Sequence, residues 1–143
     1  MSAALAFTLK LDDITPSLDA LASDDLKTRM LDAAGTLIGS MAQRAFDEPA
    51  LRPRSWVARK DKKPHALLIK SGDLRQGIHH QVSGDTVAVG SPKQYAAVHQ
   101  LGSRNGSTPE RPFFPVLNDQ LTGEATAELD DIMAALIGEA GGQ

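Results

Sequence analysis

Residues 17–46 have the sequence SLDALASDDLKTRMLDAAGTLIGSMAQRAF, and this stretch decides the fold. Its apolar side chains recur at steps of three and four residues, the spacing that places them on one face of an α-helix. Ser23, followed by two aspartates, has the composition of an internal N-cap that would divide the stretch into two helices. Gly35 and Gly39 would suit a close approach of another helix, but we expect them to be merely tolerated, at a modest cost in helix stability.

The chain before this helix has the alternation of a half-buried β-strand. Leu5, Phe7, Leu9 and Leu11 occupy alternate positions, and side chains of a strand point in turn to its two faces. Pro16 fits the entry of the following helix, where its missing N–H is not needed. The sequence thus predicts a strand before the helix.

A hairpin and a short helix are expected in the middle of the chain. Alternating residues from Leu74 to Val82 form one strand face, residues 83–85 (Ser-Gly-Asp) have turn composition, and residues 86–90 form the return strand. Residues 95–101 are expected to form a short helix that ends at a glycine, and residues 102–109 a loop.

A final helix is expected from about Val116 to near Ile137, with residues 138–143 as a frayed tail. The predicted fold class is α+β, in which long N-terminal and C-terminal helices pack on a small, mostly antiparallel sheet. At 143 residues the chain is expected to form one domain over residues 1–143.

Amino-acid composition and charge limit the classes of function that the protein can have. The formal net charge is −3 and the sequence pI is about 5.7, whereas a dedicated nucleic-acid binder usually carries a basic surplus. The absence of cysteine excludes disulfides, thiolate metal sites and a cysteine nucleophile. Because no bilayer-spanning stretch or signal peptide is evident, a protein made in the cytoplasm of the host cell, without membrane contact, is expected.

Candidate catalytic and metal-binding residues do not converge. His79 and His80 are neighbours on a predicted strand and point to opposite faces, so they do not share a metal easily. A hydrolase built from Ser71 or Ser91, His99, and Asp73 or Asp85 would need a strained nucleophile turn that the sequence lacks. No catalytic residue, metal site or cofactor is therefore predicted.

A basic, proline-bracketed segment spans about residues 49–66 and is expected to be an extended, mobile loop. Its cations, which include Arg52, Arg59 and Lys60, fit either a solvated loop, which we favour, or a surface that contacts DNA or protein. Trp56 is its large apolar residue and is either a core plug or an interface anchor.

Two segments resemble the phage virion morphogenesis family, the tail-completion proteins of Mu-like and related contractile-tailed phages. One is LLIKSGDLRQGI at residues 67–78, before the hairpin. The other is VGSPKQYAAVHQLG at residues 89–102, followed by PERPFF at residues 109–114. Leu101 and Gly77 stand where the family usually has a larger apolar residue and a small hydroxyl residue, which leaves the resemblance intact.

The resemblance implies a structural virion protein without catalysis, similar to neck and tail-terminator subunits that form rings, commonly hexamers. The implied partners are other copies of this chain, the tail tube and the neck or connector proteins, with genomic DNA passing through the ring without sequence-specific binding. Of Phe113 and Phe114, we expect one to be buried and one to lie at or near a contact. The candidate interface residues are Trp56, Arg59, Lys60, Tyr95, His99, Arg111, Phe113 and Phe114.

The sequence leaves alternatives open. The favoured role is tail completion and joining of tail to head; the first alternative is a tail terminator that stops growth of the tail tube. A small DNA-binding protein that uses the basic loop is an alternative of another class, and salt-dependent DNA binding would support it. The expected location is the tail or neck of the virion.

Overall fold

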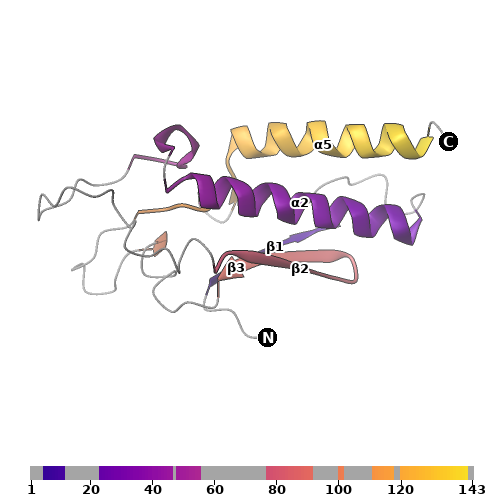
Figure 1. Ribbon diagram of the computed structural model, residues 1–143, viewed down its shortest axis with the longest axis horizontal. Helices are drawn as coiled ribbons and strands as arrows, with labels where there is room; N and C mark the ends of the chain where they lie inside the picture. The colour runs from indigo at the N-terminus through magenta and orange to yellow at the C-terminus, as the bar shows by residue number, and fades with distance from the viewer. Residues whose placement is uncertain are drawn as a thin grey trace, which may run out of the picture.

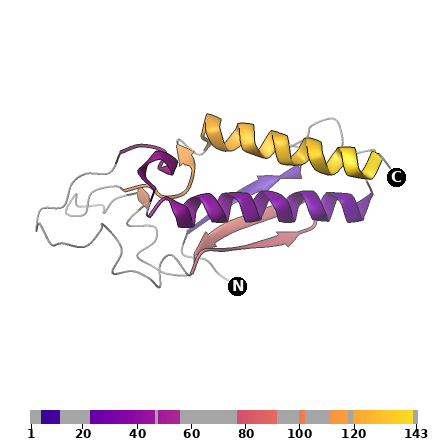
Figure 2. The same cartoon turned by 45° about the horizontal axis from the view of Figure 1, so that its top comes forward.

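The computed structural model is α+β, which confirms the predicted fold class. It describes residues 5–11, 23–46, 48–55, 77–91, 100–101, 111–117 and 120–141. Both long helices lie on the same side of a three-stranded sheet, α2 next to the strands and α5 farther away against α2 (Figures 1 and 2). The two helices are α2 (Asp24–Arg44) and α5 (Gly123–Gly141), and the sheet is formed by β1 (Leu5–Lys10), β2 (His79–Ser83) and β3 (Thr86–Ser91).

The sheet is antiparallel throughout, with β3 in the centre and the order β1-β3-β2. The predicted turn and return strand of the hairpin are confirmed: Ser83 pairs with Thr86, and Gly84 turns the chain with a φ of 59°, which glycine adopts without steric cost. The first strand was predicted from Leu74 but begins at His79; residues 77–78 are not part of it, and residues 74–76 lie outside the described residues. The alternation predicted for β1 is also confirmed, because Leu9 is buried and its two neighbours are exposed. Apolar side chains of all three strands therefore share the face toward α2.

Helix α2 begins where the sequence places an internal N-cap. The Ser23 hydroxyl accepts a hydrogen bond of 3.1 Å from the Leu26 backbone N–H, so it satisfies one of the free donors of the first turn. The earlier part of the predicted helix, residues 17–22, lies outside the described residues. The side of α2 that faces the core is fully buried at Met30, Leu31, Ala34, Ile38 and Ala42.

Gly35 is not merely tolerated, and this expectation is wrong. It faces β2, and a Cβ at this position would lie 2.5 Å from the Cγ and Cδ2 atoms of His80. Glycine therefore allows α2 to approach the sheet where a histidine ring stands between them. Gly39 is different, since its Cβ would meet Ile78 at an ordinary 3.8 Å.

The C-terminal helix begins later and ends later than predicted. Val116–Leu117 (β4) and Gln120–Leu121 (β5) form a small antiparallel pair instead of the first helical turn. The helix α5 starts at Gly123 because the Thr122 hydroxyl accepts a hydrogen bond of 3.3 Å from Ala125 N–H. At its other end the helix continues four residues past Ile137, to Gly141.

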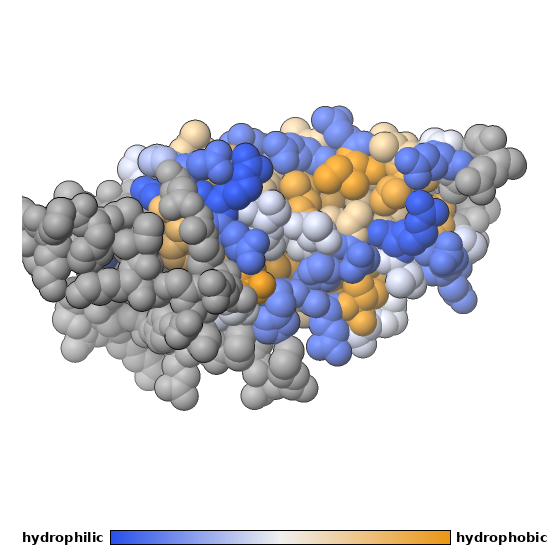
Figure 3. Space-filling view, in the orientation of Figure 1, coloured by the Kyte–Doolittle hydropathy of each residue, from blue (hydrophilic) through white to orange (hydrophobic). Residues whose placement is uncertain are grey.

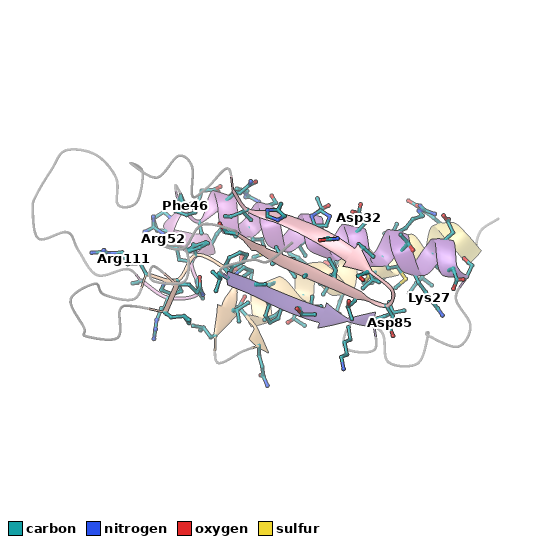
Figure 4. All side chains as sticks on the ribbon, turned by 90° about the horizontal axis from the view of Figure 1, so that it is seen from below. Lys27, Asp32, Phe46, Arg52, Asp85 and Arg111 are labelled. Carbon is teal, nitrogen blue, oxygen red and sulfur yellow. The ribbon has the colours of Figure 1, made fainter. Side chains whose placement is uncertain are left out.

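The two helices run antiparallel and close one core with the sheet. Ala125, Leu129 and Met133 recur every four residues and are the buried side chains of α5. An ion pair of 3.4 Å between Arg29 and Glu139 joins the start of α2 to the end of α5. The opposite face of the sheet is covered by none of the described helices (Figure 4).

The close approach at Gly35 generates a test. Gly35→Ala should lower the free energy of unfolding by about 1–3 kcal/mol, the usual cost of overpacking, because the added methyl group overlaps the His80 ring. Urea denaturation of both proteins measures the difference.

Gly39→Ala is the matched control on the same helix. Its methyl group fits, so we expect no loss, and a gain of up to about 1 kcal/mol from helix propensity. Equal stability of the two alanine variants would contradict the overpacking account, whereas loss of the Gly35→Ala penalty in a His80→Ala background would support it.

Candidate functional site

The side chain of Gln100 joins two segments that are distant in sequence. Its Oε1 atom accepts hydrogen bonds of 3.0 Å from the backbone N–H groups of both Phe113 and Phe114. Gln100 is 7% exposed, so these bonds form away from water. The second motif of the resemblance and the Arg-Pro-Phe-Phe segment are therefore parts of one unit, the Gln100 clamp.

Beneath the clamp lies an aromatic cluster. The ring of Phe113 is tilted against Phe46, at the end of α2, with the ring centroids 5.2 Å apart. It also contacts the ring of Phe114, with the centroids 4.9 Å apart. Tilted pairs at these separations are favourable beyond the area that they bury. The cluster thus fixes the clamp to the C-terminal end of α2.

Both phenylalanines belong to the core, although only one of them was expected to be buried. The expectation that one lies at or near a contact with a partner stays a prediction. Phe113 is 0% and Phe114 is 2% exposed. The reason is local: Pro112 and Pro115 on either side are also fully buried and keep the segment extended along the protein. Loss of either ring would open a cavity in the fold, so assembly defects of such variants would not identify an interface.

Of the other interface candidates, only Arg111 lies among the described residues. Arg111 is half-buried at the start of the same segment. Residues 56–60, with Trp56, Arg59 and Lys60, and residues 92–99, with Tyr95 and His99, lie outside the described residues. They remain predictions. The last two residues of the predicted short helix, Gln100 and Leu101, are helical.

Leu101 and Gln100 were not predicted as site residues. Leu101 is 67% exposed and is the one large hydrophobic side chain exposed among the described residues. Both residues belong to the second motif of the resemblance, but the sequence alone does not show which of the two side chains is buried and which is exposed. In the structure, Gln100 turns inward to the clamp and Leu101 points to the surface.

The basic segment begins as ordered structure, which corrects the prediction of an extended loop over its first residues. Pro49–Leu51 forms a short 3-10 helix. The guanidinium of Arg52 donates hydrogen bonds of 2.6 Å to Ala45 O and 3.1 Å to Phe46 O, just beyond the end of α2. Burial lowers the pKa of Arg52, but arginine stays protonated in proteins. The positive charge of Arg52 therefore stabilises the negative C-terminal end of the α2 dipole. Its guanidinium is already hydrogen-bonded within the protein.

The histidines of β2 point to opposite faces, as predicted. His80 faces α2, where its Nε2 donates a hydrogen bond of 2.8 Å to Asp32 Oδ1. The His79 side chain makes a local contact, with its Nδ1 atom 2.8 Å from the backbone oxygen of Gly77. Within the described part of the chain, no three histidine or acidic side chains gather as metal ligands. Ser91 and Asp85, two candidates for hydrolysis, lie at opposite ends of β3.

The sequence pattern of the phage virion morphogenesis family matches residues 10–136, which is most of the chain and includes the clamp, the hairpin, α2 and most of α5. The chain belongs to the phage virion morphogenesis family. This finding confirms the resemblance carried by the two motifs, and it places the protein in a structural family that acts in phage assembly.

One curated relative is the putative capsid assembly protein G of Escherichia phage Mu, which is 38% identical over 68 residues. The match covers 41% of this chain and 44% of that protein, so the chain spans less than half the length of its relative. No solved structure matches. Neither long helix, in the part of the chain that the structure describes, is long and apolar enough to cross a membrane.

The clamp generates the next test. Gln100→Leu keeps the bulk of the side chain but removes the acceptor of two buried N–H groups, each of which costs about 1–3 kcal/mol when unsatisfied. We expect the free energy of unfolding to fall by about 2–4 kcal/mol in urea titration.

The neighbouring exposed residue provides the control. Leu101→Gln should change stability by less than about 0.5 kcal/mol, as substitutions on the surface usually do. If Gln100→Leu were as stable as this control, the two hydrogen bonds would not hold the segments together.

Proposed function

We propose that this protein completes the phage tail and joins it to the head, as a subunit of a ring at the end of the tail tube. The observation that carries the proposal is the Gln100 clamp. It unites the two parts of the second family motif, residues 89–102 and 109–114, through buried hydrogen bonds rather than forming an open site with convergent polar groups. Such a construction suits a protein whose work is to present a fixed surface to other proteins.

The pattern of polar residues supports a structural role. The buried polar side chains of the described residues are Ser91 and Gln100, and Gln100 is used to hold backbone. The His80–Asp32 pair is also local to the fold, since it lies over Gly35 and ties the sheet to α2. Gln100 and the His80–Asp32 pair each have a contact that holds parts of the fold together, and this supports a structural use of these groups.

The alternative hypothesis, DNA binding through the basic segment, loses support. Arg52 opens that segment, and its guanidinium donates to the Ala45 and Phe46 carbonyl groups instead of pointing to solvent. The net charge of −3 also opposes phosphate binding by the protein as a whole.

The proposal is tested in a phage that carries this gene with a stop codon. Electron microscopy of its lysates should show filled heads and tails of finished length that are not joined, because assembly stops at the last connection. Expression of the intact gene from a plasmid should restore joined, infective particles.

The alternatives give different pictures in the same experiment. Tails of uncontrolled length would replace the proposed role with that of a tail terminator. Normal, infective virions would overturn a structural role and bring DNA binding forward. A plasmid copy with Gly39→Ala should rescue as well as the original gene, which controls for changes that leave the fold intact.

A further inference from the structure

The three-stranded sheet has two edges, formed by β1 on one side and by β2 on the other. Both strands pair with the central strand β3. Figure 4 shows β1, the violet strand, at one border of the sheet and β2 at the opposite border. The strands β4 and β5 pair with each other in a separate sheet. Within the described part of the chain, no further strand therefore extends the three-stranded sheet at either edge.

The edge formed by β1 lacks the features that usually prevent another strand from adding to a sheet. Edge strands are commonly protected by charged side chains, by proline or by a bulge. Residues 5–9 are uncharged and contain no proline, and their one-to-one pairing with β3 leaves no bulge. The single charge of β1 is Lys10, at its last position, whereas the five residues of β2 include two histidines and a glutamine. β1 is thus the edge better suited to receive a strand.

The backbone of β1 presents alternate residues to the outer side of the sheet. Just after the strand, Leu11 N–H donates a hydrogen bond of 2.8 Å to Asp85 O, on the side of β3. In an antiparallel ladder the residues that bond to a given neighbour alternate along the strand. The odd-numbered residues of β1 therefore face β3, and Ala6 and Thr8 direct their backbone N–H and C=O groups away from it. Both residues are exposed.

The side chains of β1 leave apolar surface beside this edge. Leu5 and Phe7 pack against the core but are only half-buried, whereas Leu9 is buried farther along the same face. Hydrophobic side chains also reach the surface between α2 and α5 (Figure 3), but there the two helices already cover each other. Because β1 is the last described strand on its side of the sheet, an added strand would cover Leu5 and Phe7 further.

We infer that two copies of this chain pair through β1, antiparallel and centred on Phe7, so that their two sheets join into one. In this register Ala6 of each copy lies opposite Thr8 of the other. Both residues direct their backbone groups outward, so each of these pairs exchanges two hydrogen bonds. The two Phe7 side chains meet at the centre, where a cross-strand aromatic pair is stabilising.

The strand is complementary to itself in this arrangement, which favours a second copy over another protein as the partner. Leu5 of one copy lies opposite Leu9 of the other, so apolar side chains meet along the inner face. The two Lys10 side chains lie at opposite ends of the paired segment, and like charges therefore do not face each other. The contact uses the same surface on both copies and has two-fold symmetry. It goes beyond the proposed tail role and does not rest on it.

Introduced cysteines test the pairing directly, because the chain contains no cysteine of its own. Ala6→Cys and Thr8→Cys are made as separate proteins, one with an affinity tag, and are then mixed and oxidised. Opposite residues of a hydrogen-bonded pair have Cα atoms about 5.5 Å apart, which a disulfide spans. Identical residues of the two copies are diagonal neighbours, about 7–8 Å apart, which exceeds that span. Non-reducing gel electrophoresis should therefore show mixed dimers and few dimers of either variant alone.

Gln81→Cys is the matched control. Gln81 is exposed on the same face of the sheet but belongs to β2, at the opposite edge. Mixed with either of the other cysteine variants, it should form few disulfides.

Thr8→Pro tests the edge without cysteines. The Thr8 N–H points away from β3, so proline removes no hydrogen bond within the sheet, but it removes one donor from each copy at the contact. Sedimentation velocity should show a dimer of the wild type that is weakened about tenfold or more in this variant. Circular dichroism checks that the variant is folded, and the cysteine variants decide the matter if it is not.

Other results overturn the inference. Dimers of Thr8→Cys with itself, without mixed dimers, would contradict the register centred on Phe7. Mixed dimers no more abundant than those of the Gln81→Cys control would show random collision, and a folded Thr8→Pro variant that dimerises like the wild type would exclude this edge. If the wild type stays monomeric at every concentration, pairing through β1 fails. The proposed tail role is decided separately, by the phage with the stop codon.

Discussion

The structure depends on helix α2 being covered on two sides. One side packs on β2 and β3, and the other packs on α5, so buried positions extend around more of this helix than a single stripe allows. Its small residues make both approaches close: Ala34 and Ala42 are fully buried, and Gly35 leaves room for the His80 ring. The antiparallel placement of α5 follows, because that helix must bring Ala125, Leu129 and Met133 against α2 and join its last turn to Arg29.

Much of this fold could be predicted from the sequence because the signals are local. The alternation in β1, the N-cap at Ser23 and the turn at Gly84 each depend on side chains within a few residues. The predictions from sequence are wrong where a contact with a residue distant in the chain determines the local structure. The need for glycine at position 35 comes from His80, 45 residues later. The apolar periodicity predicted that the last helix begins at about Val116. In the structure β4 pairs with β5 in this region, and the helix begins at Gly123, after the N-cap at Thr122.

The candidate site was predicted less well, and for the same reason. Sequence indicated that the segment with Phe113 and Phe114 mattered, but aromatic residues are favoured both in cores and at interfaces. Only the fold decides between these environments, and here the flanking prolines and Phe46 place both rings inside. The resemblance, in contrast, identified the right segments. Gln100 explains why the two parts of the second segment occur together, since its side-chain oxygen accepts from Phe113 and Phe114 while its backbone belongs to residues 89–102.

The Gln100 clamp and the Arg29–Glu139 ion pair act at opposite ends of helix α2. Helix α2 has 21 residues, which corresponds to about 30 Å, and it connects these two ends as one rigid element. The clamp fastens residues 100–101 and 111–115 to one end of that helix through the contact of Phe113 with Phe46. The ion pair of Arg29 with Glu139 fastens the last turn of α5 to the other. Because both ends are anchored to one helix, the fold keeps the Gln100 clamp and the last turn of α5 at a fixed separation along α2.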